Sequence, residues 1–270
     1  QSLIDVQIPS DKDDVTTQDL DTSRYYTLDE INEYILEADS DCGIDCSVIS
    51  FASSCEGRDI NMIKIGRPGS GRKAVWVDAG IHAREWIAPA VSMYFIERLI
   101  KDDGVDPEVT QLRDEYDWYV VPVVNPDGYD YTWTNDRMWR KTRCNHGDSC
   151  LGVDGNRNFD FMWDQEGGAS DNPCASNYRG PFPASDPEIE AIQDFIEPIR
   201  ADFRFLMTLH SYGQILLYPW GYTQDEDPDD YEDLQAVADI GVDAINAVHD
   251  AGYTHGRTGG IMSGNSMDWA

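Results

Sequence analysis

The stretch Ala74–Trp86, AVWVDAGIHAREW, joins a continuous apolar run to a polar segment that carries a histidine and a glutamate. A short apolar run that ends at a glycine is typical of a strand covered on both faces of a sheet. The same kind of run recurs as WYVVPVVNP (Trp118–Pro126), FRFLMTLHS (Phe203–Ser211) and QILLYPW (Gln214–Trp220). These four segments predict buried strands of one sheet.

Helical patterns alternate with these strands. Thr27 and Glu30 form a capping-box pattern, and Ser185 and Glu188 repeat it with Pro187 in the first turn. The apolar positions on one helical face are Leu28, Ile31, Tyr34 and Ile35, then Ile189, Ile192 and Ile196, and in a third helix Leu234, Val237, Ala244, Ile245 and Val248. There is no internal repeat and no linker rich in Gly, Pro or Ser. The sequence therefore predicts an α/β fold in a single domain: a mixed, mostly parallel, twisted β-sheet with helices on both faces.

The charge balance of the 270 residues excludes some partners. Against 20 Lys and Arg stand 51 Asp and Glu, which gives a formal net charge of −31. Such a chain repels nucleic acid and anionic membrane surfaces, because both bind clustered cations. No window is apolar enough to span a membrane, and the first residues lack the basic and apolar pattern of a signal peptide. We expect a soluble chain that binds neither nucleic acid nor membrane.

The six cysteines are Cys42, Cys46, Cys55, Cys144, Cys150 and Cys174. None forms the C-x-x-C pair of a structural zinc site, and all lie in polar, turn-rich sequence. Disulfides in an oxidising compartment are favoured over thiols or metal ligands. Six cysteines allow fifteen complete pairings, so the spacing alone assigns no bond.

Two of the predicted strands lead directly into potential metal ligands. His82 and Glu85 follow the first strand, and His210 ends another. In an α/β sheet, reactive groups tend to lie where the strands end. Two imidazoles and a carboxylate are the donor set of a catalytic zinc site that keeps a fourth position for water. Each residue alone is weak evidence, since a lone histidine at a strand end is more often a structural group.

Basic residues cluster in a chain that has few of them. The string RMWRKTR (Arg137–Arg143) is strongly basic, and DGNRNFD (Asp154–Asp160) adds a further arginine. The alternative interpretation of the first string is a solvated structural patch. Because a desolvated arginine usually binds a planar anion, we favour an anion-binding role.

Taken together, these segments resemble the zinc metallocarboxypeptidases of the carboxypeptidase A/B type. The matching segments, in the family's order and spacing, are HAREW (His82–Trp86), PVVNPDGY (Pro122–Tyr129), RMWRKTR, GVDGNRNFD (Gly152–Asp160), LHSYGQILLYPWG (Leu209–Gly221) and SGNSMDW (Ser263–Trp269). The resemblance covers nearly the whole chain from about Tyr26 onward. The RMWRKTR string indicates the digestive A/B branch, since the regulatory branch usually lacks it.

The resemblance implies roles for individual residues. It makes His82, Glu85 and His210 the ligands of one zinc ion. The other correspondences are Arg140 with the arginine that polarises the scissile carbonyl, Asn156 and Arg157 with the pair that binds the terminal carboxylate of the substrate, and Arg84 and Tyr212 with neighbouring subsite residues. The implied reaction is hydrolysis of the C-terminal peptide bond of peptides and proteins, with zinc as Lewis acid.

The resemblance also implies a disulfide, the maturation of the protein and its location. Cys150 and Cys174 bracket the NRNFD segment as the family's common disulfide does, and if all six cysteines pair, Cys144 joins one of the three early ones. The match begins near the N-terminus and leaves no room for a pro-segment. We expect a secreted, extracellular, zymogen-derived digestive enzyme and a monomer. Its expected partners are peptides with a free C-terminus and proteinaceous carboxypeptidase inhibitors.

Two features depart from the family pattern. The family's general-base glutamate follows the segment matching SGNSMDW, whereas this sequence has no Glu after Glu232 and stops at Ala270. No Tyr follows Tyr253, where the family has a loop with a mobile tyrosine; missing residues or a deletion would explain this. We expect one catalytic domain over residues 1–270 that lacks its C-terminal strand and helix. A catalytically inactive relative is the alternative.

Met267 stands at the position that is acidic in B-type enzymes, and Leu217 and Gly221 match other positions of the pocket wall. The apolar Met267 implies an A-type preference for apolar or aromatic C-terminal residues. A B-type preference for Lys and Arg stays open, because an acidic surface attracts basic peptides over long range. The remaining alternative is a zinc-holding protein that binds peptide C-termini without cutting them.

Overall fold

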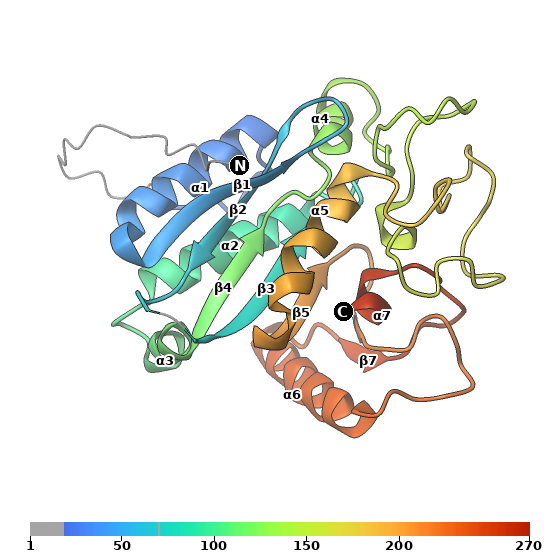
Figure 1. Cartoon of the computed structure of the whole chain (residues 1–270). Helices are drawn as coiled ribbons and strands as arrows, with labels where there is room; N and C mark the ends of the chain where they lie inside the picture. Colours follow the sequence, from blue (N-terminus) through green and yellow to red (C-terminus); the bar gives the residue numbers. More distant parts are fainter. Residues whose placement is uncertain (1–18, 70) are drawn as a thin grey trace.

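The fold is that of a computed structural model, which describes residues 19–69 and 71–270 (Figure 1). Residues 1–18, which carry the predicted absence of a signal peptide, lie outside the described residues. The helices are α1 (Leu28–Cys42), α2 (Ile87–Lys101), α3 (Pro107–Glu115), α4 (Pro126–Thr134), α5 (Pro187–Ile196), α6 (Tyr231–His249) and α7 (Ser266–Trp269), with 3-10 turns at Gly43–Asp45, Gly155–Arg157 and Glu197–Asp202. The strands are β1 (Cys46–Ser53), β2 (Asp59–Ile65), β3 (Lys73–Ala79), β4 (Tyr116–Val121), β5 (Phe203–Leu209), β6 (Ile215–Leu217) and β7 (Thr254–Gly256).

Five strands form the main sheet in the order β1-β2-β4-β3-β5, and β6 pairs with β7 in a separate two-stranded sheet. The β1–β2 and β2–β4 pairs are antiparallel, whereas β3 runs parallel to both β4 and β5. The β6–β7 pair is also parallel. The predicted α/β fold with a mixed sheet is confirmed, but two of the four strand pairs of the described main sheet are antiparallel, so the sheet is not mostly parallel.

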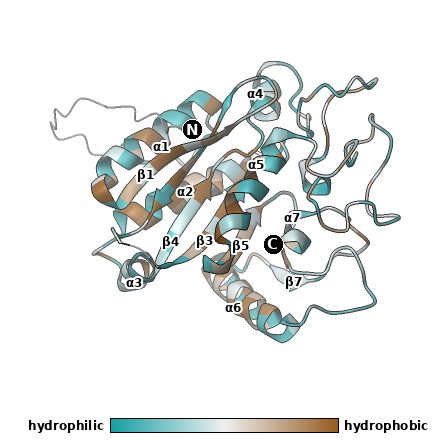
Figure 2. Ribbon diagram, in the orientation of Figure 1, coloured by the Kyte–Doolittle hydropathy of each residue, from teal (hydrophilic) through white to brown (hydrophobic). Residues whose placement is uncertain are grey.

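Each face of the main sheet carries its own hydrophobic core. Side chains alternate along β3, so that Val75 and Val77 pack against α1 and α2, whereas Trp76 packs against α5 on the opposite face. Figure 1 shows α5 in front of the sheet and α2 behind it. In Figure 2, hydrophobic residues are concentrated in the sheet and on the helix faces that meet it. Helices therefore cover both faces, as the continuous apolar strands require.

The two predicted capping boxes have different outcomes. At α1 the box is present, because the Thr27 side chain accepts from the Glu30 N–H and Glu30 Oε2 accepts from the Thr27 N–H at 2.7 Å. At α5 the prediction is wrong: Asp186 is the N-cap residue, and no side chain caps the helix. Glu188 instead points into the interior, where it is fully buried. The sequence pattern does not distinguish a capping glutamate from a buried one.

Three of the four apolar runs form strands of the main sheet, as predicted, but not all of these strands are buried on both faces. The segment QILLYPW contributes only β6, which lies outside the main sheet and leaves Ile215 and Leu217 each 43% exposed. The expected burial of this strand on both faces is therefore wrong. In β5, Phe205 is 44% exposed. Among the described strands, β5 pairs with β3 alone, and β6 pairs with β7 alone. Continuous apolar sequence thus does not imply a central strand.

Three disulfides connect the six cysteines. Cys150–Cys174 is present, as the resemblance implied, and the other two bonds are Cys42–Cys46 and Cys55–Cys144. The last bond joins the turn between β1 and β2 to the residue that follows the basic string. Within the described part of the chain, no helix has both the length and the apolar character needed to cross a bilayer.

Candidate metal centre

The parallel pairing of β3 and β5 brings the two histidines together. Ala79 lies opposite Leu209 in the register, so both strands end at the same edge of the sheet. His82 follows β3 after the turn at Gly80, and His210 follows β5 directly. Gly80 has a φ of +67°, and a Cβ there would lie 3.2 Å from Val123 Cα, so this tight turn requires glycine. Strand topology therefore places two residues 128 positions apart on one site.

Glu85 completes a group of three side chains that could hold a metal ion. A backbone bond from the Glu85 N–H to the His82 carbonyl closes the turn that brings the carboxylate back to the imidazole. Glu85 Oε1 lies 2.9 Å from His82 Nδ1, and Glu85 Oε2 lies 3.0 Å from His210 Nδ1. The two Nδ1 atoms are 3.1 Å apart. Ligand atoms from all three residues lie within 4.8 Å of one another.

The donor set fits a zinc ion. Two ring nitrogens that point at each other and a carboxylate that meets both have the composition of a three-residue catalytic zinc site. His82 and Glu85 are nearly buried, with 4% and 6% of their side chains exposed, whereas His210 is 29% exposed. The group is thus anchored in the interior and accessible from the side of His210. Burial opposes ionisation of Glu85, but hydrogen bonds with His210 and His82 outweigh it and lower the pKa of this carboxyl.

A buried aspartate supports the His82 ring from behind. Asp154 Oδ1 lies 2.9 Å from His82 Nε2, and the Asp154 side chain is fully buried. Burial disfavours the Asp154 carboxylate, yet the neighbouring His82 and Arg140 lower its pKa. A carboxylate behind a metal-ligating imidazole fixes the ring and its tautomer. Sequence reasoning did not single out Asp154, although a carboxylate at the start of a cationic string was the available signal.

Arg140 connects the basic string to this group. Its Nη2 donates to Asp154 Oδ2 at 2.8 Å, and its Nη1 lies 3.3 Å from Glu85 Oε1. The Arg140 carbonyl accepts a hydrogen bond from the Ala83 N–H, which ties the string to the turn between the metal-ligating residues. The guanidinium is therefore held at the edge of the metal group with 17% of the side chain exposed.

Asn156 and Arg157 lie on the other side of the group, in the turn Gly155–Arg157. The Asn156 N–H donates to Asp154 Oδ1 at 3.0 Å, and Asn156 Nδ2 is 3.3 Å from His210 Nε2. Asn156 Oδ1 accepts from both the N–H and the hydroxyl of Ser266. Ser266 was also missed by sequence reasoning, because the link joins segments 110 residues apart.

Arg157 is a half-buried cation with spare hydrogen-bonding capacity. Its Nη1 donates to the Asn156 carbonyl at 2.6 Å, while its Nε is buried and has no hydrogen-bond partner among the described residues. Burial lowers the pKa of this guanidinium, an effect that the nearby Asp154 opposes. The arrangement leaves a cationic hydrogen-bond donor beside the metal group.

Met267 lies against the wall positions that the sequence assigned to the pocket. A Cβ added to Gly221 would stand 3.1 Å from Met267 Cε, and 3.1 Å from Asn265 Nδ2. Asp268 fixes the same wall by accepting from the N–H groups of Gly221 and Tyr222. Gly264, just before these residues, has a φ of +59°, and its carbonyl accepts from the Phe159 N–H. Residues 263–269 are thereby joined to the segment that carries Arg157.

The last two predicted site residues are not part of this hydrogen-bonded group. Tyr212 is fully exposed at the surface. Arg84 is half-buried, and its backbone carbonyl accepts a hydrogen bond from Arg137 Nη1 at 2.8 Å. The structure thus gathers the three metal-ligating residues with Arg140, Asn156 and Arg157, and leaves these two at the periphery.

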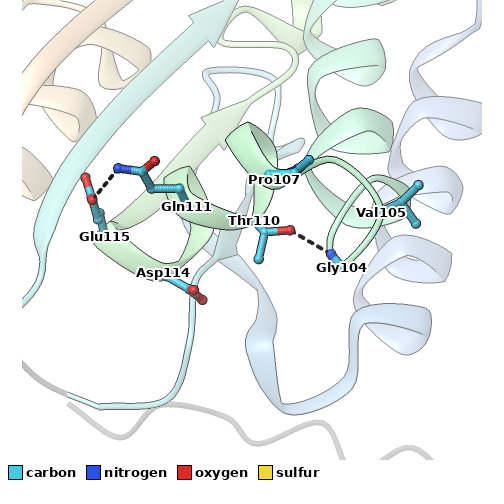
Figure 3. Close-up of a pocket in the computed structure, with 7 residues that line it drawn as sticks. All are labelled: Gly104, Val105, Pro107, Thr110, Gln111, Asp114 and Glu115. Atoms are coloured by element: carbon cyan, nitrogen blue, oxygen red, sulfur yellow. Dashed lines mark hydrogen bonds between the residues drawn. The ribbon is translucent and has the colours of Figure 1, made fainter.

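A separate depression lies on α3 and the loop that precedes it (Figure 3). It has a volume of about 520 Å³, and its lining residues are Gly104, Val105, Pro107, Thr110, Gln111, Asp114 and Glu115. Gln111 donates to Glu115, and Thr110 Oγ1 accepts from the Gly104 N–H, as Figure 3 shows. Asp114 pairs with Arg67. None of the predicted site residues lines this depression.

Comparison with known proteins identifies the family of the chain. The zinc carboxypeptidase family matches residues 31–270. The chain belongs to the zinc carboxypeptidase family. It is 40% identical to carboxypeptidase B from Astacus astacus over 93% of this chain and 83% of that protein. It is 39% identical to carboxypeptidase A1 from Mus musculus over 94% of this chain and 61% of that protein, and 42% identical to human carboxypeptidase B over 80% and 52%.

Solved structures of the zinc carboxypeptidase family superpose closely on this fold. Thrombin-activatable fibrinolysis inhibitor has a TM-score of 0.87 at 36% identity, over 92% of this chain and 63% of that one. Carboxypeptidase A from Helicoverpa armigera has a TM-score of 0.86 at 28% identity, over 96% and 64%. The chain thus spans about half to two thirds of most of these relatives. The predicted class, a zinc-dependent metallocarboxypeptidase, is confirmed, and the relatives include both A and B types.

Proposed function

We propose that this protein is a zinc-dependent exopeptidase that hydrolyses the C-terminal peptide bond of peptides and proteins. The observation that carries the proposal is the guanidinium of Arg157. It is half-buried beside the metal group, and among the described residues it forms no ion pair with a carboxylate and its Nε has no partner. Asp154 acts on this guanidinium from nearby but forms no ion pair with it, so its free donor is suited to bind a carboxylate supplied by a ligand.

Each neighbouring side chain has a task in this proposal. Arg157 and Asn156 bind the terminal carboxylate, which sets the last peptide bond beside the metal group. Arg140, held at this edge by Asp154, stabilises the negative charge that develops on the carbonyl oxygen. When bound by His82, Glu85 and His210, zinc supplies Lewis-acid polarisation and a more acidic water.

The pocket wall supports an A-type preference. Met267 is apolar and packs near Gly221. At the position of Met267, a B-type enzyme requires a negative charge to pair with Lys or Arg. We therefore propose preferential release of apolar and aromatic C-terminal residues, with a B-type preference as the alternative.

The setting of the enzyme is also proposed. Three disulfides favour an oxidising, extracellular compartment. We propose that the protein acts as a monomer on peptides with a free C-terminus. The bovine thrombin-activatable fibrinolysis inhibitor has been solved in complex with tick carboxypeptidase inhibitor, which supports a protein inhibitor of this kind as a partner here.

The test uses N-acylated dipeptides that end in Phe, Leu, Lys or Glu, each as the free acid and as the C-terminal amide. Zinc-loaded protein should release the last residue from the free acids only, fastest for Phe and Leu. A chelator should abolish the release, and added zinc should restore it. Binding of acids over amides without any release would identify a non-catalytic binder of C-termini instead.

The variant Arg157→Gln tests the observation behind the proposal. We expect binding of the free acids to weaken by about 10- to 100-fold, since hydrogen bonds to charged groups are worth about 1.5–3 kcal/mol. Binding of the amides should change little. Arg179→Gln is the matched control, because Arg179 pairs with Asp171 on a separate loop. Equal weakening of acids and amides would refute recognition of the carboxylate by Arg157.

A further inference from the structure

A second cluster of reactive side chains lies around the disulfide Cys55–Cys144. One atom each of Cys55, Cys144, Asp186 and Glu188 lies within 4.8 Å of the others. None of these residues has a part in the proposed peptidase site. The two sulfurs differ in access, because Cys55 is exposed whereas Cys144 is only 3% exposed. A disulfide of this kind can be attacked from solvent at one sulfur only.

Glu188 is placed beside the buried sulfur. Its Oε2 lies 3.8 Å from Cys144 Sγ. Its side chain is fully buried, and its Oε1 has no hydrogen-bond partner among the described residues. Burial opposes ionisation of this carboxyl group and outweighs the backbone N–H groups of Glu188 and Cys55, which favour the ionised form, so the group is kept neutral. Glu188 therefore holds a proton next to a sulfur that would otherwise leave as a buried thiolate.

The charges around Glu188 also favour its protonated, neutral form. Burial, followed by the negative charges of Asp186 and Asp127, raises the pKa of Glu188 to about 8. The side chains beside these two acids already contact them: His146 Nε2 lies 2.6 Å from Asp186 Oδ1, and Arg58 pairs with Asp127. The same negative charges disfavour a thiolate at Cys144. Reduction of the bond thus requires a proton at Cys144, and Glu188 is in place to supply it.

We propose that Cys55–Cys144 is a thiol–disulfide exchange site in which Glu188 is the proton donor to Cys144. The thiolate of a dithiol attacks Cys55 Sγ, forms a mixed disulfide there and breaks the bond to Cys144. The electron pair goes to Cys144 Sγ, which takes the proton of the Glu188 carboxyl group. The second thiol of the dithiol then loses its proton to solvent, and its thiolate attacks the dithiol-derived sulfur of the mixed disulfide, which releases Cys55 as a thiolate and leaves the dithiol as a cyclic disulfide. The Glu188 carboxylate takes up a proton from solvent.

The surrounding contacts allow this exchange without global unfolding. Arg143 Nε donates to Glu56 Oε1 at 2.8 Å, so the turn beside Cys55 and the end of the basic string stay connected after the bond opens. Arg58 and Ser54 hold the same turn to Asp127. Reduction therefore loosens the segment that follows Arg140 but leaves its other anchors intact.

The first test measures how fast a dithiol such as dithiothreitol reduces each of the three disulfides. Alkylation at timed intervals followed by peptide mass mapping resolves the bonds. For Glu188→Gln we expect reduction of Cys55–Cys144 to slow about tenfold or more at neutral pH, since general acid catalysis is worth at least that much. Reduction of Cys42–Cys46 and Cys150–Cys174 should not change. Glu190→Gln, an exposed change on the same helix, is the matched control.

Two further measurements separate proton donation from a structural effect. After division by the concentration of reductant thiolate, the rate for the unaltered protein should fall above about pH 8, where Glu188 loses its proton, and the rate for Glu188→Gln should stay level. A monothiol should become trapped on Cys55. Parallel pH profiles for the two proteins would overturn the role of Glu188, and a mixed disulfide on Cys144 would overturn the proposed direction of attack. Both readouts in the unaltered protein remain informative if the variant does not fold.

Discussion

Asp154 Oδ1 lies 2.9 Å from His82 Nε2, on the side of the imidazole ring opposite Glu85. The ring is therefore held between two carboxylates, one behind it and one within the candidate metal group. When His82 Nε2 carries the proton, it donates to the Asp154 carboxylate, and the Nδ1 atom of the same ring keeps a lone pair directed at the candidate metal group. This carboxylate is thus expected to govern how well the three ligands hold a metal.

Asp154→Asn should weaken zinc binding about 10- to 100-fold, since an amide no longer fixes the His82 tautomer. Competition with a chromogenic chelator measures the affinity without any peptidase assay. Asp127→Asn serves as the control, because Asp127 is equally buried but bonds to Ser54 and Arg58 instead. An unchanged zinc affinity in Asp154→Asn would show that the ligands are oriented without this carboxylate.

Met267→Asp should move the specificity from apolar toward basic C-terminal residues. A carboxylate in the pocket wall pairs with Lys or Arg and is costly beside Phe. We expect the ratio of kcat/KM for Lys over Phe substrates to rise about 10- to 100-fold. Met138→Asp makes the same change at an exposed methionine and controls for long-range charge. If both variants shift the ratio equally, surface charge rather than the pocket wall sets the preference.

Glu188 should make the stability of the protein depend on pH in a defined window. Its pKa is raised from 4.5 to about 8 in the folded state. Below about pH 4.5 the group is neutral in both states; as the pH rises toward 8, only the unfolded chain ionises, and unfolding becomes easier. By pH 7 this costs about 3 kcal/mol of the free energy of unfolding.

Denaturant unfolding of the parent and Glu188→Gln between about pH 5 and about pH 9 measures this effect, because the slopes from other groups cancel in the difference. The variant should gain stability relative to the parent as the pH rises, and the gain should level off above about pH 8. A difference that does not vary with pH would mean that Glu188 ionises normally in the folded protein.

Removal of each disulfide by paired Cys→Ser changes should cost stability in the order of loop length. The bonds close loops with sequence separations of 89, 24 and 4 residues for Cys55–Cys144, Cys150–Cys174 and Cys42–Cys46. The chain-entropy relation gives losses of about 4.6, 3.5 and 2 kcal/mol respectively. Thermal or denaturant unfolding ranks the three variants. A larger loss for Cys42–Cys46 than for Cys55–Cys144 would show that local packing, not loop closure, dominates.

Local sequence patterns predict the parts of the fold that depend on near neighbours. The capping box at Thr27 and the apolar run of β3 both appear in the structure as expected. The Ser185–Glu188 pattern and the QILLYPW run mislead for a common reason. Whether Glu188 caps a helix or enters the core, and whether β6 joins the main sheet, depends on chain segments that are distant in sequence.

The residues of the candidate site likewise fall into those that local sequence predicts and those that it does not. His82 and Glu85 are separated by one turn, and His210 is found because both histidines follow apolar strands. Local sequence patterns do not identify Asp154 and Ser266, since only the folded chain brings Asp154 behind His82 and Ser266 against Asn156. No periodicity marks a residue whose only task is to orient another.

Gly264 limits how the pocket can be re-engineered. A side chain at this position would place its Cβ 2.4 Å from the carbonyl oxygen of Arg157. A mutant library that seeks new substrate preferences can vary Met267, whose side chain contacts the wall. Diversity at position 264 would instead displace the backbone of Arg157, the proposed carboxylate-binding residue, so most of those clones should lose the proposed recognition of the substrate's C-terminus.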